Sequence, residues 1–431
     1  MSKILLSYLV LLLAGRSVFA EIANTNLTPP DAASIALENN RDLAAARFAV
    51  QQAEGRLKQA GLWPNPDFEL SRRRDTPFAN EGEYSFSTGF KQRFPITGRL
   101  GKAKAVGRVD VALAWAEIRN RERLLIGEVL AKSRSVLVLK ELLKSSQETA
   151  KFLEQLVQVS EKRLTVAEVS VTDVNLAKLE LQRLLLAQNQ FQIEQSASLS
   201  ELNRLLGRDA KEPLEIIGEL STAPVPLSLN ELRQKVLAFR PDRQLAILSI
   251  DRGAAEVKLA RALKWEDWSV GFDYSRDRQV FNAPIGNKED QFVGLSLSIP
   301  LPLWNKNQGR IAEARATEER AKAELAALDL TILAEVQIAF NRLERLQPLV
   351  QQHRQETLKL AEDNIALLQK GYAQGLVSIA LVIQAQQQLA ALRQSFWEIV
   401  GQFARSQTDL ETATATSPFL KSQSSNNPNN P

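Results

Sequence analysis

Few residues of this 431-residue chain have both the type and the spacing that a chemical site needs. The run GRLGKAKA at residues 98–105 resembles a phosphate-binding loop, but Lys102 is followed by Ala103 and the first glycine spacing is wrong. His353, the single histidine, lies in a charged helical pattern that favours a solvated structural role. Carboxylates alternate with Lys and Arg along helical stretches, so no paired acid–base site stands out. These patterns do not predict an enzyme.

The cysteine count and the charge balance exclude further classes of site. The chain has no cysteine, which excludes disulfides, thiolate catalysis, cysteine-ligated zinc and a lipid-modified N-terminal cysteine. With one histidine as well, we expect no cofactor and no resident transition-metal cluster. The 54 Lys and Arg against 50 Asp and Glu leave a net charge of only +4, with signs alternating along helices. Nucleic-acid binding therefore has little support.

The two ends of the chain differ in composition from the rest. Lys3, the apolar run at residues 4–14 and the small residues Val18 and Ala20 predict a signal peptide over residues 1–20. The alternative is a buried N-terminal helix. No later segment has 18 consecutive apolar residues, so no transmembrane helix is predicted. Residues 416–431, polar and rich in Asn and Pro, are expected to be a disordered tail.

The elements that could position a site meet at two similar junctions. In residues 291–309, Val293, Leu295 and Leu297 alternate with small or polar residues, which predicts a strand with one apolar face. Two prolines then end the strand, and a long alanine-rich helix begins near Gln308. Residues 83–101 repeat this passage from strand to helix. The junction residues singled out are Pro95, Gly98, Pro300, Pro302 and Gly309.

The remaining periodicity predicts mostly long helices. Helices are expected over residues 28–62, 100–164, 171–206, 229–263, 309–370 and 378–415, with Pro348 kinking the fifth or forcing a local adjustment. Strands are expected over 67–74, 83–94, 268–276 and 291–299. The last helix carries a heptad seam, so it needs neighbouring helices. Its seam residues are Leu389, Leu392, Phe396, Ile399, Phe403 and Leu410.

Matching features recur about 200 residues apart. Asp42 matches Asp242, and residues 169–170 match residues 377–378 with the same Val-Ser pair. We therefore predict a first repeat over residues 21–210, a connector over 211–228 and a second repeat over 229–415. Each repeat holds a helix, two strands, a long helix and a further helix.

The four predicted strands pose a problem of closure. A sheet in lipid must close, and four strands are too few to form a barrel, so several chains would have to contribute. Apolar side chains would face outward, with serine, glycine and charged side chains inward. The alternative is two soluble hairpins that cap a helical bundle.

Together these features resemble the TolC family of outer-membrane efflux channels over residues 28–415. The second junction is most similar to the heavy-metal (CzcC-like) branch. The resemblance rests on the duplicated layout, on the junctions FPITGRLGKAKA and IPLPLWNKNQGRIAEARA, and on the helix breaks RLTVAEVSVTDV and GYAQGLVSIALV.

The resemblance implies a membrane β-barrel joined to a long α-helical coiled-coil barrel. Three identical chains would give four strands each to a twelve-strand barrel in the outer membrane of a Gram-negative-type bacterium, with helices extending through the periplasm. The channel would be a passive exit duct for substrates, divalent heavy-metal cations in this branch. A periplasmic adaptor (membrane fusion protein) and an inner-membrane resistance–nodulation–division pump would deliver them. The alternatives are a drug or small-molecule channel of the same family and a soluble periplasmic coiled-coil scaffold.

The resemblance also assigns the two helix breaks to the periplasmic tip. The family pattern carries an aspartate after each break, which is Asp173 in the first, whereas Leu381 takes the matching position in the second. Asp173 would attract cations to a constriction; alternatively, it marks a helix start. Ala167 stands where the second break has Gly375, which suggests a turn that depends less on glycine. The tip or gate residues are Ser170, Thr172, Asp173, Gly371, Gly375, Ser378, Leu381 and Gln384.

Overall fold

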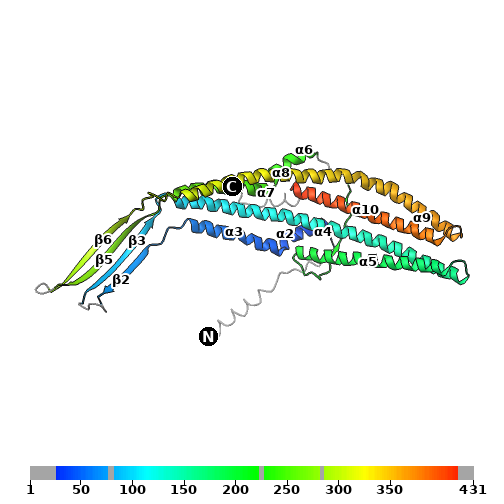
Figure 1. The fold of residues 1–431 in the computed structure, drawn as a ribbon, viewed down its shortest axis with the longest axis horizontal. Helices are drawn as coiled ribbons and strands as arrows, with labels where there is room; N and C mark the ends of the chain where they lie inside the picture. The colour runs from blue at the N-terminus through cyan, green and yellow to red at the C-terminus, as the bar shows by residue number, and fades with distance from the viewer. Residues whose placement is uncertain (1–25, 76–81, 223–227, 282–285, 416–431) are drawn as a thin grey trace, which may run out of the picture. The chain divides into compact units, whose positions relative to one another are not determined.

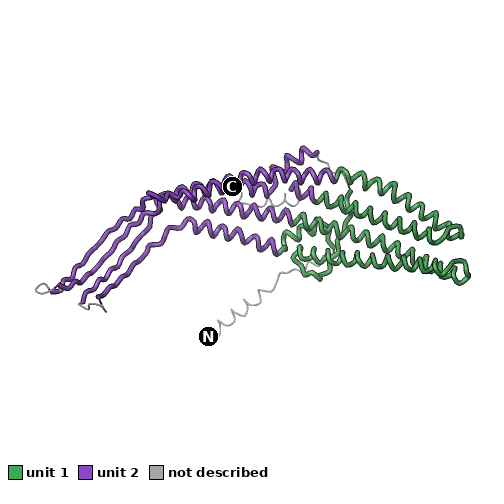
Figure 2. The backbone as a smooth tube through the Cα atoms, in the orientation of Figure 1, with its two compact units in different colours: residues 1–40, 125–224, 343–408 green, residues 41–124, 225–342, 409–431 purple. Residues whose placement is uncertain are grey.

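A computed structural model describes residues 26–75, 82–222, 228–281 and 286–415. The predicted signal peptide, the predicted tail and parts of the two strand–strand loops lie outside the described residues. The chain forms two compact units, each built from separate stretches of sequence (Figure 2). Unit 1 comprises residues 1–40, 125–224 and 343–408, and unit 2 comprises residues 41–124, 225–342 and 409–431.

Unit 2 contains a four-stranded antiparallel sheet in the order β2-β3-β5-β6 (Figure 1). Its strands are β2 (Asp67–Arg74), β3 (Tyr84–Phe94), β5 (Trp268–Val280) and β6 (Asn287–Ser298). All four predicted strands are confirmed. β5 extends four residues beyond its predicted end at residue 276, and β6 begins four residues before its predicted start at residue 291. Among the described residues, β2 and β6 each have a neighbouring strand on one side only.

The sheet has two chemically distinct faces because residues directly opposite each other in antiparallel strands share a face. The rings of Phe68 and Phe90, which are paired in register, lie 4.9 Å apart. The face that these two rings share, here called the apolar face, also holds Leu70, Phe86, Val270, Phe272, Val293, Leu295 and Leu297. The opposite, polar face holds Ser71, Ser85, Ser87, Gly89, Gly271, Asp273, Ser275, Gly294 and Ser296. The predicted alternation is therefore confirmed.

The helices of unit 2 precede or follow the strand pairs along the chain. They are α3 (Arg41–Ala60), α6 (Leu229–Phe239), α7 (Pro241–Ala262) and the parts in this unit of α4 (Arg99–Thr165) and α8 (Gln308–Gln352). At 67 residues, α4 is about 100 Å long at 1.5 Å per residue, and it contains no proline. The predicted long helix is thus confirmed to within one residue at each end.

Unit 1 is helical apart from one short parallel pair, β1 (Asn26–Leu27) with β4 (Glu215–Ile216). Its helices are α2 (Pro29–Asn39), α5 (Val171–Leu205), the π-helical turn η1 (His353–Thr357), α9 (Leu358–Ala373) and α10 (Ile379–Ala413) up to residue 408, with the rest of α4 and α8. Leu389, Phe396, Phe403 and Leu410 of the predicted seam are all buried. Apolar burial of this kind is what stabilises helices too long to persist alone.

Two helices predicted as continuous are each broken in the middle. The break between α2 and α3 lies at Asn40, whose buried amide Nδ2 donates to Leu205 O at 2.8 Å. The break between α6 and α7 lies at Arg240, where the following Pro241 disfavours helical backbone. In both cases the residue at the break is extended, with ψ near 120°. The predictions of single helices over 28–62 and 229–263 were therefore wrong.

The irregularity predicted at Pro348 takes the form of η1, five residues further along the chain. Proline has no N–H to donate to the preceding turn, so the helical ladder must adjust near it. Helix continues through η1 into α9. His353 lies in η1, where its Nε2 is 3.1 Å from Leu392 O and its ring stacks on Phe396.

Across the described ranges, no helix has the length and apolar character needed to cross a membrane.

Candidate functional site: helix turns and strand–helix junctions

The first turn, residues 166–170, joins α4 to α5 and is closed by a capping box. Asp173 N donates to Ser170 Oγ at 3.2 Å, and Ser170 N donates to Asp173 Oδ2 at 3.1 Å. The Ser170 hydroxyl also lies 2.7 Å from Asp173 Oδ2 and 2.6 Å from Thr172 Oγ1. Asp173 thus fixes the start of α5, where a carboxylate also complements the positive end of the helix dipole.

The second turn, residues 374–378, joins α9 to α10 with the same backbone geometry as the first. Ala167 has a φ of 56° and Gly375 a φ of 76°, both in the left-handed region. Glu168 N donates to Arg163 O, and Leu376 N donates to Gly371 O, each at 2.9 Å. These are the bonds of a Schellman C-cap. The first turn therefore adopts the conformation that favours glycine although alanine occupies it.

The other predicted residues of the second turn have different surroundings. A Cβ on Gly371 would lie 2.7 Å from Val377 Cγ2, so a larger residue at this position would have to displace the Val377 side chain. Ser378 is exposed and directly precedes α10. Leu381 and Gln384 lie on the exposed face of α10, on either side of two buried residues, and neither position carries an acid.

Arg163 of α4 connects the two turns within unit 1. Its Nη1 donates to Tyr372 O and its Nη2 to Ala373 O, each at 3.0 Å, at the C-terminal end of α9. Its guanidinium carbon also lies 4.7 Å from the centroid of the Tyr372 ring. A cation at this end of α9 satisfies unpaired helix carbonyls and complements the helix dipole. The sequence did not single out Arg163.

Tyr372 makes a second link to α4 through its hydroxyl. Ser160 Oγ donates to Leu156 O at 2.6 Å, so the Tyr372 hydroxyl, 3.2 Å from Ser160 Oγ, must be the donor to it. Ser160 is fully buried and Tyr372 is 7 % exposed. Tyr372 belongs to an apolar core that includes Leu153, Ala177, Ile379 and Val382. Both helical hairpins contribute to this core, so the two turns are held by packing as well as by polar bonds.

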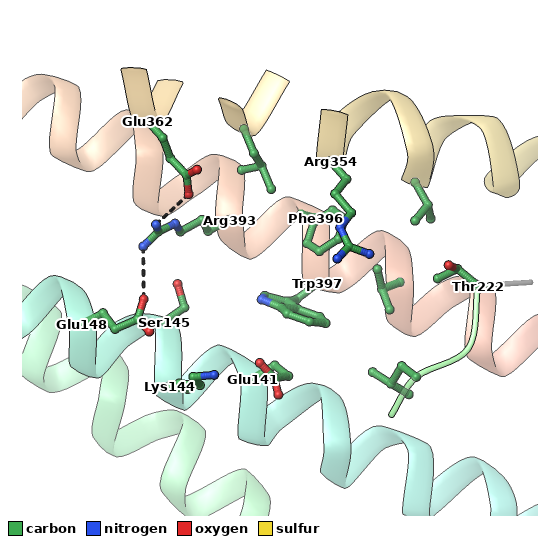
Figure 3. Close-up of a pocket in the computed structure, with 14 residues that line it drawn as sticks. Glu141, Lys144, Ser145, Glu148, Thr222, Arg354, Glu362, Arg393, Phe396 and Trp397 are labelled. Carbon is green, nitrogen blue, oxygen red and sulfur yellow. Dashed lines mark hydrogen bonds and ion pairs between the residues drawn. The ribbon is translucent and has the colours of Figure 1, made fainter. Parts of the chain in front are cut away.

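Further from the turns, a cavity of about 460 Å³ lies within unit 1 (Figure 3). Phe396 and Trp397 of α10 line it together with residues of α4, α8 and α9. Arg393 pairs with Glu362 at 2.7 Å and with Glu148 at 3.6 Å. This arginine joins α10 to α9 and α4 beside a lining that mixes apolar side chains with further charged and polar ones, among them Glu141, Lys144 and Arg354 (Figure 3).

The two strand–helix junctions of unit 2 each contain a tight turn centred on proline. Ile96 N donates to Phe94 O across Pro95 at 3.0 Å, and Leu303 N donates to Leu301 O across Pro302 at 2.9 Å. Proline presets the φ that such three-residue turns need. Pro300 follows β6 after one further residue, so the predicted stop at the prolines is confirmed.

At each junction, polar side chains at the start of the following helix form hydrogen bonds that hold this helix in place. Gly98 has a φ of 64°, and the next residue, Arg99, pairs bidentately with Asp267, with its Nε 2.7 Å from Oδ1. The Asp267 hydrogen bond raises the pKa of Arg99 above its ordinary value, although partial burial opposes this. At the second junction Asn307 has a φ of 57° and donates through Nδ2 to Ala260 O at 2.7 Å. A Cβ at position 309 would meet open space, so packing does not require glycine there.

The family model of outer membrane efflux proteins matches residues 32–208 and again residues 232–416. The chain belongs to the outer membrane efflux protein family. It is an outer-membrane channel component rather than an enzyme, as the sequence predicted. The predicted resemblance to this family is likewise confirmed.

Three relatives of this efflux protein are similar to it over most of their length. The cobalt-zinc-cadmium resistance protein CzcC of Cupriavidus metallidurans is 24 % identical over 399 residues, covering 91 % of each chain. The pyoverdine export outer membrane protein OpmQ of Pseudomonas putida is 25 % identical, covering 82 % of this chain and 78 % of its own. The cation efflux system protein CusC of Escherichia coli O157:H7 is 25 % identical, covering 89 % and 84 %.

Solved structures of outer-membrane channels, CusC among them, support the fold. One of them aligns with a TM-score of 0.73 at 20 % identity, covering 90 % of this chain and 92 % of CusC. At this identity the likeness concerns the fold alone.

Proposed function

We propose that three copies of this chain close one twelve-strand barrel and form the outer-membrane exit duct of a tripartite efflux system. The observation that carries this proposal is the exposed apolar face on a sheet with two unpaired edges. Leu295 is 81 % exposed, Val293 71 % and Leu70 64 %. Lipid is the environment that suits such a face, and pairing of β6 with β2 of the next copy would satisfy the edge backbone groups. The polar face would then line the pore.

Aromatic side chains near the junctions support this placement. Trp304 is 86 % exposed and Trp63 is 60 % exposed, and both lie close in sequence to the inner ends of the strands. Exposed tryptophan is typical of the boundary between lipid and water. The junctions, with Pro95, Gly98 and Pro302, would mark the passage from the barrel wall to the helical tunnel in the periplasm.

The two-fold match of the family model supports the proposed duplication. The first matched range, 32–208, falls within the first expected repeat, and the second, 232–416, coincides with the second expected repeat to within one residue at its end. The two helix breaks, at Asn40 in the first repeat and Arg240 in the second, also form similar hydrogen bonds to the last helix of their repeat. Asn40 donates to Leu205 O near the end of α5, and Arg240 Nη1 donates to Ala413 O at the end of α10. Each break would thus anchor the last helix of its own repeat.

We further propose that the two turns form the periplasmic entrance. Apolar side chains are exposed at both, with Leu376 76 % and Val166 65 % exposed. An adaptor protein could cover these side chains when it docks. The Arg163–Tyr372 contacts would hold the two hairpins of one chain together and so restrict opening. Asp173 is proposed as a helix start, since its recorded bonds all close the capping box.

The proposed substrates are divalent heavy-metal cations delivered by an inner-membrane resistance–nodulation–division pump. The similarity to CzcC and CusC supports cations, whereas the similarity to OpmQ supports a small-molecule alternative. The cations would pass through the duct as cargo. Nothing in the proposal requires the chain to store them.

Deletion of the coding sequence tests the substrate. Growth should become more sensitive to zinc, cobalt, cadmium or nickel and should recover on complementation, with a drug panel as the comparison. Sensitivity to drugs alone would overturn the metal assignment in favour of small-molecule export. A mature protein that stays soluble and monomeric without detergent would overturn the channel itself.

A further inference from the structure

The end of the apolar face nearest the strand–strand loops carries arginines instead of apolar side chains. In the register, Arg72 pairs with Phe86, and Phe86 pairs with Arg276. One step further along, Arg74 pairs with Tyr84, and Tyr84 pairs with Arg278. Because directly opposed residues share a face, all four side chains belong to the apolar face. We call them the arginine patch: Arg72, Arg74, Arg276 and Arg278.

Most of the charge in this patch has no counter-ion within the described part of the chain. Arg276 is paired with Glu289, whose other oxygen accepts from the Tyr84 hydroxyl at 2.9 Å. In the described residues no carboxylate lies within 4 Å of the other three guanidinium groups, and Arg278 Nε is shielded from solvent with no hydrogen-bond partner. Within the described residues Glu289 therefore forms a close ion pair with only one of the four arginines, although it also lies directly opposite Arg278 in the register.

The depth of the patch matches the edge of a membrane. Arg276 lies eight residues beyond Trp268, the inner end of β5, a distance of about 26 Å along a strand. With a strand tilt of about 40° this corresponds to about 20 Å across the membrane, against an apolar band of about 25 Å in barrels of this kind. The arginine side chains can extend the remaining distance toward the lipid headgroups. Phe86 and Tyr84 lie between them, as expected for an aromatic belt at the interface.

We propose that the arginine patch binds the phosphate groups of lipid headgroups in the outer leaflet of the membrane. The proposal rests on the proposed function, since it needs the apolar face to contact lipid. A guanidinium group donates two parallel hydrogen bonds to phosphate oxygens and tolerates partial desolvation better than lysine. Arginines on β2 and β5 would recur at every second strand around a closed barrel, about 10 Å apart. The patch would fix the height of the barrel in the membrane.

The test compares two double variants of the full-length protein in neutral detergent. R72Q/R74Q removes two unpaired cations from the apolar face, and R73Q/K91Q removes two cations from the polar face of neighbouring strands. Diphosphorylated lipid A is titrated while the melting temperature is followed, with the same lipid lacking both phosphates and inorganic phosphate as comparisons. Wild type and R73Q/K91Q should be stabilised by the phosphorylated lipid alone. The apparent affinity of R72Q/R74Q should fall about 30-fold, at roughly 1 kcal/mol per arginine.

Equal affinities of the two double variants would overturn the proposal, and so would equal stabilisation by the dephosphorylated lipid. Stabilisation of the wild type by inorganic phosphate alone would show a free-anion site and also overturn the lipid assignment. If R72Q/R74Q does not fold, Arg278→Gln against Lys91→Gln repeats the comparison with single changes. Conductance in neutral phosphatidylcholine bilayers keeps the two proposals apart. If the wild type conducts but is stabilised equally by phosphorylated and dephosphorylated lipid, only the proposal for the arginine patch is refuted. If the wild type never inserts into the bilayer, the channel proposal is refuted.

Discussion

The guanidinium group of Arg163 lies over the ring of Tyr372, with 4.7 Å from its carbon to the ring centroid, and also donates to the Tyr372 carbonyl oxygen. These residues are 209 positions apart and belong to different helical hairpins of unit 1. One side chain therefore caps α9 and joins the two turns. If the turns form the channel entrance, this contact holds the entrance in the conformation described here.

Arg163→Ala should loosen the two turns and increase conductance. The change removes two charge-assisted bonds to helix carbonyls and a cation–π contact, each bond contributing about 1.5–3 kcal/mol at most. Single-channel recording in planar bilayers would measure the effect. Lys162→Ala is the matched control, because Lys162 is the exposed neighbouring cation. Equal conductance in the two variants would show that Arg163 does not restrict the entrance.

Replacing glycine by alanine should have opposite effects at two positions. Gly375→Ala places a Cβ at a φ of 76°, which costs about 1 kcal/mol and should lower the melting temperature. Gly55→Ala, in α3 with open space around the new Cβ, should raise stability by about 0.5–1 kcal/mol. Thermal unfolding of the two variants checks this pair. A Gly375→Ala protein as stable as Gly55→Ala would contradict the left-handed turn.

Ser170→Ala and Asp173→Ala should behave alike if Asp173 acts as a capping residue. Each removes half of the capping box and should destabilise the start of α5 by about 1 kcal/mol. Neither should change the ratio of cation to anion permeability, measured from reversal potentials in a salt gradient. A loss of cation selectivity in Asp173→Ala alone would instead assign Asp173 to a filter.

Glu122→Gln should stabilise the protein at neutral pH. Burial raises the pKa of Glu122 above its ordinary value, and Arg47, whose Nη2 is 3.7 Å from Oε1, only partly opposes this. The folded state therefore binds a proton more readily than the unfolded state, so stability falls as pH rises from the unfolded pKa through the raised folded pKa. Glu122→Gln should remove this dependence, measured as melting temperature from pH 4 to pH 8.

An exposed acid on the same helix provides the control for Glu122. Glu117 forms an exposed pair with Arg121, at 2.9 Å between Nε and Oε1. Glu117→Gln should change stability by no more than a few tenths of a kcal/mol. A Glu122→Gln protein that is less stable than wild type at pH 7 would mean that the ion pair with Arg47 outweighs the cost of burial.

The strands and the long helices could be predicted because their causes are local. Alternation of Leu295 and Ser296 sets the sheet faces, and the absence of proline from residues 100–164 permits one helix. The break at Asn40 was not predicted, and the bond that its buried amide donates goes to Leu205, 165 residues away. The same holds for Arg163, whose partners belong to the other hairpin. Pairings this distant leave no trace in local periodicity.

Asp173 shows how far the candidate site could be read from sequence. The spacing of Ser170 and Asp173 fits a helix start, and the capping box bears out that interpretation of the residue types. Whether the carboxylate also faces a pore depends on neighbouring copies of the chain, which no periodicity within one chain encodes. The strands that would pair with the free edges of β2 and β6 likewise belong to neighbouring copies of the chain in the proposed trimer.

Conductance across a planar lipid bilayer tests the central claim most directly. The purified full-length protein, added from detergent to a neutral bilayer, should insert and give discrete current steps, with larger steps for Arg163→Ala. Absence of current steps from both wild type and Arg163→Ala, with the protein remaining outside the bilayer, would contradict an outer-membrane exit duct.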